Sequence, residues 1–311
     1  MATCLVTGAS GFVGGHLATA AAAAGWRTRA VGGARPVELA ADVEVLPPRS
    51  IGPETAWLDA LASVDVVFHL AGLAHGRDGG DAAALQRVNV DGALALARTA
   101  VRAEVGRFVF VSSIGVHGNA SPAGPLREDS ALRPEAPYAE SKLAAEQALQ
   151  TQLAGSATEL VIVRPPLVHG PGAPGNPARL LRLVRSGLPL PLASVRNRRS
   201  FVSVANLCAA LLCCGLHPRA AGETFLVADR AVLSTPELLR ALAARAGVAA
   251  RLLPCPPRLL RAGAALVGRG GDVDRLIADL EVDASRITRL LGFEPPQGLE
   301  AALDAWAAGP A

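Results

Sequence analysis

The sequence predicts an α/β fold in which a doubly wound parallel sheet is followed by a smaller C-terminal subdomain. Short apolar runs alternate with helical stretches over the first half of the chain, and strands that alternate with helices form parallel sheets with right-handed crossovers. Apolar residues dominate the run at residues 64–70, which is typical of a strand buried on both faces. Prolines and glycines crowd residues 165–177, so we expect an irregular loop or a domain junction there.

The predicted elements begin with a strand, a turn and a helix. The first strand covers residues 2–6, and the first helix covers residues 12–24, which Gly25 can end through a left-handed cap. From Ser234 onward the pattern is one of helices interrupted by prolines. Between these parts, strands are expected at residues 26–31, 43–46, 64–70, 107–112, 159–163 and 223–228, and helices at residues 82–104, 138–153 and 202–216.

Composition and charge exclude several classes of protein. Half of the 311 residues are apolar, which is enough to bury a large core and excludes a disordered chain. The net charge of +3 is too small for the one-sided field of a typical nucleic-acid binder. No apolar run reaches the roughly 18 to 20 residues that span a bilayer, so we expect no membrane insertion.

The cysteines and the N-terminal residues bear on the compartment and on metals. The five cysteines show no CxxC spacing, and the first basic residue is Arg27, so the basic start of a secretory signal is missing. These features favour a cytoplasmic protein without structural zinc. His69, His75, His117 and His169 are too scattered to propose any metal site.

A glycine-rich turn joins the first predicted strand to the first helix. Its glycines Gly8, Gly11 and Gly14 stand three residues apart. In such a turn the first glycine permits the bend, the second lets the backbone approach a phosphate, and the third allows the helix to pack closely. The helix N-terminus adds N–H donors and the positive end of its dipole. We therefore predict a dinucleotide-binding site, although an ordinary glycine turn has the same spacing.

This site suggests how the chain is divided. Residues 1–163 are expected to form a Rossmann-like dinucleotide-binding domain, to which residues 200–228 return. Residues 164–199 and 229–311 then form the substrate-binding subdomain. We expect that subdomain over the carboxyl ends of the strands, because open α/β sheets place their ligands there.

The end of the second predicted strand bears on the choice of cofactor. An NAD-binding domain normally has a carboxylate about 20 residues beyond the glycines, where it accepts hydrogen bonds from the ribose hydroxyls. Here Gly32 and Gly33 follow the strand and the first acid is Glu38, whereas Arg29 and Arg35 could pair with a 2′-phosphate. NAD and NADP are both candidates, with a slight preference for NADP. Alternatively, either arginine merely faces solvent.

Two rare residues stand four positions apart. Lys142 is the only lysine among the 30 basic residues, and Tyr138 is the only tyrosine. Residues four apart share a helix face, so the ammonium group lies towards the phenol. The phenol, with a pKa of about 10, is a poor base at neutral pH unless a positive charge stabilises the phenolate. Any helix can hold a Tyr and a Lys, but the coincidence of these two single residues favours a catalytic pair.

Other polar residues could act beside this pair. Ser112 and Ser113 close the predicted strand at residues 107–112, at the edge where a substrate would lie. One hydroxyl can hold the reacting oxygen, or both serines are ordinary turn or cap residues. Asn89 is a polar residue in an apolar helix, where it could serve a proton path or make a core hydrogen bond.

The sequence resembles the extended short-chain dehydrogenase/reductase family, in the NAD-dependent epimerase/dehydratase group that works on nucleotide sugars. The resemblance implies that Tyr138 is the acid/base, that Lys142 anchors the nicotinamide ribose and lowers the tyrosine pKa, and that Ser113 holds the sugar oxygen. It also implies that Arg199 contacts the substrate diphosphate, which needs a charged partner when desolvated. The stretches that carry it are residues 7–14, 66–72, 111–118, 164–172, 199–201 and 282–293, with Asn89, Tyr138 and Lys142.

A wider set of ligand contacts follows from the same resemblance. Cofactor contacts are expected from Gly8, Ser10, Gly11, Phe12, Val13, Gly14, Arg35, Ser50, Ile51, Leu70, Ala71, Gly72, Asn89, Tyr138, Lys142 and Pro165. Substrate contacts are expected from Ser113, His75, Asn176, Arg199 and Arg275. The implied partner is a UDP-sugar rather than a nucleic acid, and a homodimer is a further expectation.

Departures from the family pattern narrow the predicted reaction. Residues 113–115 read Ser-Ile-Gly where sugar 4,6-dehydratases carry Thr-Asp-Glu, so elimination of water is not expected. Leu167 replaces an asparagine that binds substrate in many 4-epimerases, and Ser50 replaces the aspartate of the adenine loop. The sequence is most similar to 4-keto reductases and predicts reduction of a UDP-4-keto-6-deoxy-N-acetylhexosamine, with UDP-sugar 4-epimerisation as the alternative. A dinucleotide sensor without turnover is the alternative of another class, which the presence of Tyr138 and Lys142 disfavours.

Overall fold

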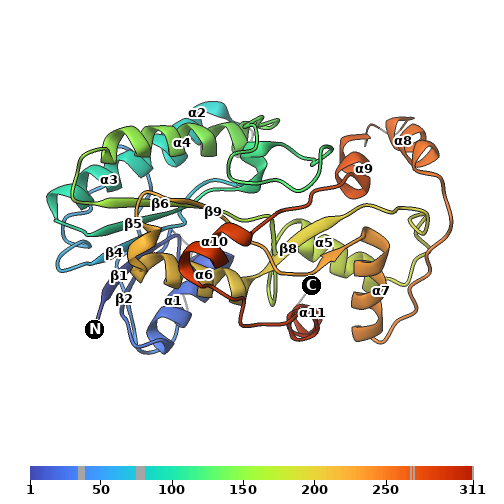
Figure 1. The fold of residues 1–311 in the computed structure, drawn as a ribbon. Coiled ribbons are helices and arrows are strands. Elements are labelled where there is room, and N and C mark those ends of the chain that lie inside the picture. Colours follow the sequence, from blue (N-terminus) through green and yellow to red (C-terminus); the bar gives the residue numbers. More distant parts are fainter. Residues whose placement is uncertain (34–38, 75–80, 267, 269, 310–311) are drawn as a thin grey trace.

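The computed structural model describes residues 1–33, 39–74, 81–266, 268 and 270–309 and shows an α/β fold with two sheets (Figure 1). The larger sheet has seven strands in the order β3-β2-β1-β4-β5-β6-β9, all parallel. This order reverses direction beside β1, as in doubly wound dinucleotide-binding sheets, and it confirms the predicted fold class. The strands are β1 (Thr3–Thr7), β2 (Arg27–Val31), β3 (Val43–Val45), β4 (Val66–His69), β5 (Arg107–Val111), β6 (Glu159–Arg164) and β9 (Thr224–Leu226).

Helices cover both faces of this sheet. Figure 1 shows α1 (Phe12–Ala23) and α6 (Val204–Leu216) below the sheet, and α2 (Ala82–Leu85), α3 (Gly92–Arg102) and α4 (Pro137–Leu153) above it. Strand β4 explains why the apolar run lacks alternation: Phe68 packs into the core beneath the sheet, whereas Val67 packs into the core above it. Both side chains are fully buried, as expected for a strand covered on two sides.

The long helix predicted at residues 82–104 is interrupted. Between α2 and α3 the chain forms a π-helical segment, η1 (Gln86–Asp91), which carries Asn89. At the start of α3, a Cβ on Gly92 would lie 2.5 Å from the side chain of Ile51, so only glycine allows the helix to pack this closely against that loop. Single π-turns often occur at functional sites, and the apolar periodicity of a helix does not reveal them.

The C-terminal half contributes a three-stranded sheet in the order β10-β8-β7. Its strands are β7 (Leu167–His169), β8 (Arg199–Ser203) and β10 (Val232–Leu233). The chain also has two short 3₁₀ turns, η2 (Ile114–His117), which follows β5 in the N-terminal half, and η3 (Pro218–Ala220), which follows α6. The helices of this half are α5 (Asn176–Arg185), α7 (Thr235–Arg245), α8 (Pro257–Leu266), α9 (Gly270–Ile277), α10 (Ser285–Leu291) and α11 (Leu299–Ala308).

The expectation of an irregular stretch at residues 165–177 is wrong in part. Strand β7 occupies residues 167–169, directly after Pro165 and Pro166. The residues of β7 therefore all have the N–H group that proline lacks, and they can pair with β8. Helix α5 begins at Asn176 with Pro177 in its first turn, where proline is well tolerated. The prolines here therefore lie at the ends of short regular elements, β7 and α5, and do not prevent those elements from forming.

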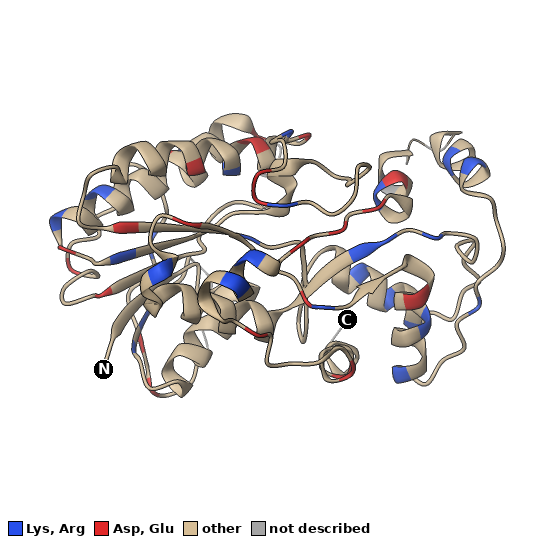
Figure 2. Cartoon of the chain, viewed as in Figure 1, with Lys and Arg blue, Asp and Glu red and all other residues tan. Residues whose placement is uncertain are grey.

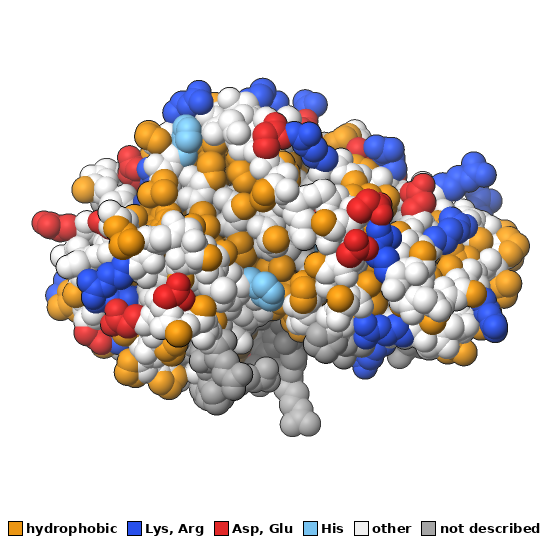
Figure 3. Space-filling model, turned by 90° about the horizontal axis from the view of Figure 1, so that it is seen from below, with side chains coloured by type: hydrophobic (Ala, Val, Ile, Leu, Met, Phe, Trp, Pro, Cys, Tyr) orange, Lys and Arg blue, Asp and Glu red, His pale blue; other side chains and the backbone are white. Residues whose placement is uncertain are grey.

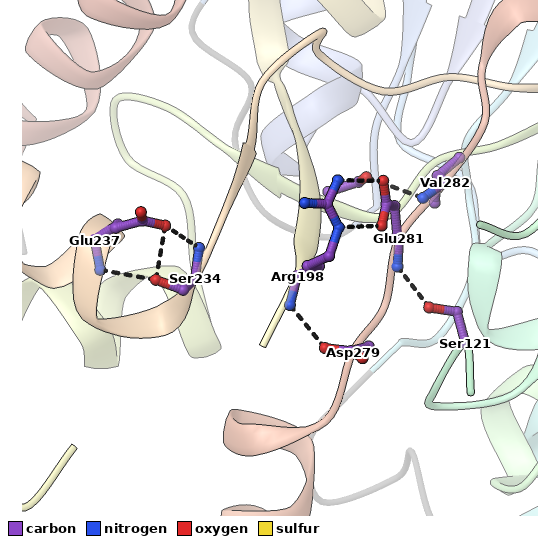
Figure 4. Close-up of polar contacts among 8 residues, drawn as sticks. Ser121, Arg198, Ser234, Glu237, Asp279, Glu281 and Val282 are labelled. Carbon is purple, nitrogen blue, oxygen red and sulfur yellow. Dashed lines mark hydrogen bonds and ion pairs between the residues drawn. The ribbon is translucent and has the colours of Figure 1, made fainter. Parts of the chain in front are cut away.

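A segment at residues 279–283 joins the two halves (Figure 4). Glu281 accepts two hydrogen bonds from Arg198, at 2.6 and 2.8 Å, and its N–H group donates to Ser121 at 2.8 Å. The N–H group of Arg198 donates to Asp279 at 2.7 Å. The segment therefore lies between β8 and the chain that follows η2, so it links the substrate half predicted from the sequence to the region of Ser113.

Charged residues of both signs are interspersed along the elements of both halves (Figure 2). The face seen from below likewise mixes apolar side chains with Arg, Asp and Glu side chains (Figure 3). Among the helices that the structure describes, none is both long and apolar enough to cross a membrane.

Candidate active site

The glycine turn is packed so closely that side chains would not fit in it. Gly8 has a φ of +75°, and a Cβ on it would lie 2.7 Å from the backbone nitrogen of Ala71. A Cβ on Gly14 would lie 2.2 Å from the carbonyl oxygen of Gly8. Helix α1 follows Gly11 without a side-chain cap, so Phe12 and Val13 begin a helix whose first N–H groups suit an anion. This turn fits a dinucleotide pyrophosphate.

Ser10 connects this turn to the end of β2. Its hydroxyl accepts a hydrogen bond from the N–H group of Gly33 at 3.0 Å. Arg29, one of the two arginines considered for a 2′-phosphate, is bound elsewhere: it pairs with Glu44 at 3.0 Å and donates to the carbonyl oxygen of Ala62 at 2.6 Å. Arg35, the other one, lies outside the described residues. A 2′-phosphate would therefore have to pair with Arg35 rather than with Arg29.

The loop at residues 49–51, where the resemblance predicts a contact with adenine, lies beside the same strand end. The N–H group of Arg49 donates to the carbonyl oxygen of Gly32 at 3.1 Å, which brings the exposed Ser50 next to the end of β2. Ile51 packs against Gly92 at the start of α3. The structure thus gathers Ser50 and Ile51 at the side of the sheet where Gly8 to Gly14 turn.

The chain after β4 completes the floor of the predicted cofactor site. The backbone of Leu70 and Ala71 lies against Gly8, and the N–H group of Leu70 donates to the carbonyl oxygen of Thr7 at 3.3 Å. His69 is fully buried, with Nδ1 2.8 Å from the Thr7 hydroxyl. Burial, with a smaller effect of Lys142, lowers the pKa of His69 to about 3, so this imidazole stays neutral.

Asn89 holds the next turn of this chain in place. Its side-chain oxygen accepts from the N–H group of Leu73 at 2.8 Å, and its side-chain nitrogen donates to Leu73 and to the Ser141 hydroxyl. A Cβ on Gly72 would lie 2.8 Å from that oxygen and 3.6 Å from the Lys142 ammonium. Asn89 makes the core hydrogen bonds that we considered from the sequence, and they fix Gly72 beside Lys142.

Tyr138 and Lys142 share one face of α4. The Lys142 nitrogen lies 6.0 Å from the centre of the Tyr138 ring and donates to the carbonyl oxygen of Val111 at 2.9 Å. Burial lowers the pKa of Lys142 to about 8, an effect that Glu146 partly offsets. Burial also raises the pKa of Tyr138 to about 12. The phenol therefore keeps its proton at neutral pH and can donate it.

Ser113 lies beside the start of α4. Its hydroxyl caps η2 by accepting from the N–H group of Gly115 at 3.1 Å. The position of a Cβ on Gly115 is 3.3 Å from that hydroxyl and 3.4 Å from the Cβ of Ala139, which follows Tyr138. Ser112 is buried, and in the described part of the chain its hydroxyl has no hydrogen-bond partner. Pro165 accepts from the N–H group of Ile114 at 2.9 Å and so places β6 against this turn.

The predicted substrate residues are brought together only in part. Arg199 donates to the carbonyl oxygens of Arg275, at 2.5 Å, and of Ala278, at 3.1 Å. Asn176 is exposed at the start of α5. His75 lies outside the described residues. The structure therefore joins the Arg199 guanidinium to the backbone of α9 and of the residue that follows it.

Sequence reasoning missed a buried polar cluster next to Lys142. Glu146, Arg164 and His117 are each at most 5% exposed, and Arg164 is hydrogen-bonded to both of the others. The only signal was spacing: Glu146 stands four residues after Lys142, as Lys142 stands four after Tyr138. In the part of the chain that the structure describes, no group of three His, Cys, Asp or Glu residues could hold a metal ion.

Curated relatives place these features in a family. The chain is 40% identical over 245 residues to a UDP-glucose 4-epimerase of Vibrio cholerae, which spans 77% of this chain and 75% of that protein. It is 32% identical over 271 residues to a GDP-6-deoxy-D-mannose reductase of Pseudomonas aeruginosa, which spans 83% of this chain and 84% of that protein.

Solved structures have the same fold. A structure of MoeE5 in complex with UDP-glucuronic acid and NAD matches with a TM-score of 0.80 and 25% identity over 99% of this chain and 98% of that one. A structure of RMD from Pseudomonas aeruginosa complexed with NADPH matches with a TM-score of 0.73 and 24% identity over 98% of both chains. The model of the NAD dependent epimerase/dehydratase family matches residues 4–228. The chain therefore belongs to the NAD dependent epimerase/dehydratase family, as its sequence motifs predicted, and is an enzyme.

Proposed function

We propose that this chain is an NAD(P)-dependent oxidoreductase that acts at the 4-position of a UDP-sugar and reduces a UDP-4-keto-6-deoxy-N-acetylhexosamine. The observation that supports the proposal is that Tyr138 and Lys142 share a face of α4 while Ser113 lies beside the start of that helix. Reduction of a ketone needs one hydride and one proton. A nicotinamide cofactor, when bound, would supply the hydride, and the protein must supply the proton and hold the oxygen that receives it.

Each of the three side chains has a distinct task in this proposal. Tyr138 donates its phenolic proton to the sugar oxygen, since its raised pKa keeps it protonated before the reaction. Lys142 is held by Val111 beneath the Tyr138 ring, where its charge stabilises the phenolate left behind. Ser113 holds the same sugar oxygen by a hydrogen bond, and its place next to α4 supports this task.

The proposed ligand contacts are divided between the two halves of the chain. The dinucleotide would bind Gly8 to Gly14, residues 50–51 and 70–72, Asn89 and Pro165. The UDP-sugar would bind residues 164–199 and 229–311, where Arg199 supplies a charge for the diphosphate. Arg199 is partly buried and oriented by two carbonyl oxygens, which suits a charge-assisted contact.

Two positions favour reduction over epimerisation. Leu167 packs against the apolar core of the C-terminal half, so it offers no hydrogen bond where many 4-epimerases bind the sugar. Ser50 is an exposed hydroxyl where the adenine loop usually has a carboxylate. An epimerase must retain its reduced cofactor while the keto-sugar turns over. Ser50 weakens the hold on the cofactor, and Leu167 weakens the hold on the keto-sugar. The likeness to the Pseudomonas aeruginosa reductase also supports a reductase.

UDP-sugar 4-epimerisation is the second candidate. The observation in its favour is the 40% identity to the Vibrio cholerae protein named UDP-glucose 4-epimerase. The set of Ser113, Tyr138 and Lys142 would serve that reaction as well, because both reactions exchange a proton at the sugar 4-oxygen.

A cofactor test separates the two reactions. We expect the purified protein to carry little bound dinucleotide and to oxidise added NADH or NADPH only when a UDP-4-keto-sugar is present. The measurement is absorbance at the reduced-nicotinamide band, with product analysis by chromatography. Interconversion of UDP-glucose and UDP-galactose, or of their N-acetyl forms, without added cofactor would instead establish the epimerase.

The choice between dinucleotides is tested by calorimetric titration. We expect both to bind, with a modest preference for NADP(H), because Ser50 and the glycines after β2 provide no carboxylate to repel a 2′-phosphate. Arg35→Ala is expected to remove the preference. Arg29→Ala is the matched control and is expected to retain it, since Arg29 is bound to Glu44. A clear preference of the native chain for NAD contradicts the prediction.

A further inference from the structure

A buried chain of polar side chains runs from α4 to the turn that carries Ser113. The Glu146 carboxylate, 1% exposed, accepts two hydrogen bonds from the Arg164 guanidinium, at 2.9 and 2.5 Å. A third guanidinium nitrogen lies 3.0 Å from Nε2 of His117. The other ring nitrogen of His117 lies 3.1 Å from the carbonyl oxygen of Ser130. The chain therefore links α4, β6, η2 and the loop at residue 130.

The protonation of His117 follows from its neighbours. A carbonyl oxygen only accepts, so Nδ1 carries the proton, and Nε2 accepts from Arg164. Burial, and next the charge of Arg164, lower the pKa of His117, so the imidazole is neutral at neutral pH. Arg164 and Glu146 thus form a neutral ion pair, and Lys142 remains as the single net charge of the buried group.

A structural role alone is a weak explanation for this arrangement. Burying an ion pair costs desolvation that its attraction often fails to repay, and apolar replacements are frequently as stable. Here the pair lies one helical turn from Lys142, which is itself 4% exposed. The polar atom bonded to Lys142 is a carbonyl oxygen, that of Val111. Among the residues that the structure describes, no carboxylate is hydrogen-bonded to this ammonium, which also lies 4.7 Å from the centre of the Phe110 ring. Glu146 is therefore the nearby negative charge that can stabilise it.

Other groups around Lys142 do not replace this effect. His69 on β4 is neutral, as its pKa of about 3 requires, and Arg164 on β6 carries the wrong sign. Tyr138 on the same helix keeps its proton. Of the other elements that pack against α4, α2 has no charged residue, η2 contributes His117, and β6 contributes Arg164 and, at its far end, Glu159, which pairs with Arg107. The charged residues of η1 and α3 are Arg87, which pairs with Glu54, Asp91, which accepts from Gln86, and the exposed Arg98 and Arg102. Glu140 on α4 itself is exposed.

We propose that Glu146 is a positioning residue that keeps Lys142 protonated and, through Arg164 and His117, holds the Ser113 turn against the start of α4. The proposal rests on the proposed function for its catalytic consequence, because only a charged Lys142 stabilises the Tyr138 phenolate. Its physical part concerns the protonation of one side chain and is measured without substrate or cofactor.

The composition of the chain makes this measurement direct. Lys142 is the only lysine, so protein labelled with ¹³Cε-lysine gives one lysine resonance whose shift reports its protonation against pH. Since the Glu146 charge raises the pKa of Lys142, Glu146→Gln is expected to move the titration midpoint to lower pH by about one pH unit or more. Glu146→Asp keeps the charge and is expected to stay near the native midpoint.

A control pair exists at the other end of β6. Arg107 and Glu159, at the start of β5 and β6, form a second Arg–Glu pair at 2.6 Å. Glu159→Gln removes a carboxylate from an arginine in the same way, and the Lys142 midpoint is expected not to move. An unchanged midpoint in Glu146→Gln, or an equal shift in Glu159→Gln, overturns the proposal.

A second variant covers the case in which Glu146→Gln does not fold. Glu146→Gln combined with Arg164→Met leaves no unpaired guanidinium. The Lys142 midpoint of this double variant is expected to lie below that of the native chain, and a midpoint at the native value would overturn the proposal.

In active protein, the fall of kcat at high pH is expected to move with the Lys142 midpoint. If the midpoint shifts but no UDP-4-keto-sugar is turned over, the proposed function fails while the assignment of Glu146 stands.

Discussion

Replacing Tyr138 by phenylalanine is expected to lower turnover by roughly a hundredfold or more, because the reacting oxygen loses its proton donor. The substitution keeps the ring, so the contact of that ring with the Lys142 ammonium at 6.0 Å is preserved. The glycine turn and the backbone at residues 70–72 are untouched. Dinucleotide affinity is therefore expected to stay near that of the native chain.

The measurement is single-turnover and steady-state reduction of the 4-keto-sugar, with dinucleotide binding followed by calorimetry on the same preparation. A loss confined to turnover assigns the phenol to proton transfer. A parallel loss of dinucleotide affinity would mean that the variant has disturbed the cofactor site. Turnover close to the native rate would show that another group donates the proton, and the assignment of Tyr138 would be wrong.

The fold was predictable because its signals are local. The glycine spacing, the apolar runs and the turn residues are each read from a few neighbouring positions, and together they give the doubly wound sheet. The boundaries of predicted elements differ from the structure where tertiary packing determines the local backbone. The predicted helix at residues 82–104 contains the π-turn of Asn89, whose side chain accepts a hydrogen bond from the N–H group of Leu73. Sequence pattern carries no information on that contact.

The candidate site was predictable where residue identity itself was informative. Tyr138 and Lys142 stood out because the chain has one of each. Arg164 and His117 did not, because the contact that joins them spans 47 residues and depends on how β6 and η2 meet beneath α4. Arg29 was misleading for a similar reason: its partner Glu44 lies on a neighbouring strand, which only the sheet order reveals.

Gly14→Ala is expected to disrupt both stability and dinucleotide binding. The added Cβ would lie 2.2 Å from the carbonyl oxygen of Gly8 and 2.7 Å from its carbonyl carbon. Both are backbone atoms that cannot rotate away, and Gly8 is itself pressed against the backbone of Leu70 and Ala71. The turn must therefore open. We expect the free energy of unfolding to fall by about 1 to 3 kcal/mol and dinucleotide affinity to fall about tenfold or more, because the N–H groups at the start of α1 move away from the phosphate position.

Gly263→Ala provides the matched control for this variant. Gly263 lies within α8, and no atom lies within 4 Å of the position of its added Cβ. Alanine is favoured over glycine in a helix interior by about 1 kcal/mol, so this variant is expected to gain a little stability and to bind dinucleotide as the native chain does. Chemical denaturation and calorimetry compare the two. If Gly14→Ala bound dinucleotide with native affinity, the close contact of Gly14 with Gly8 would not be what shapes the site, and the phosphate would have to be held by groups other than the start of α1.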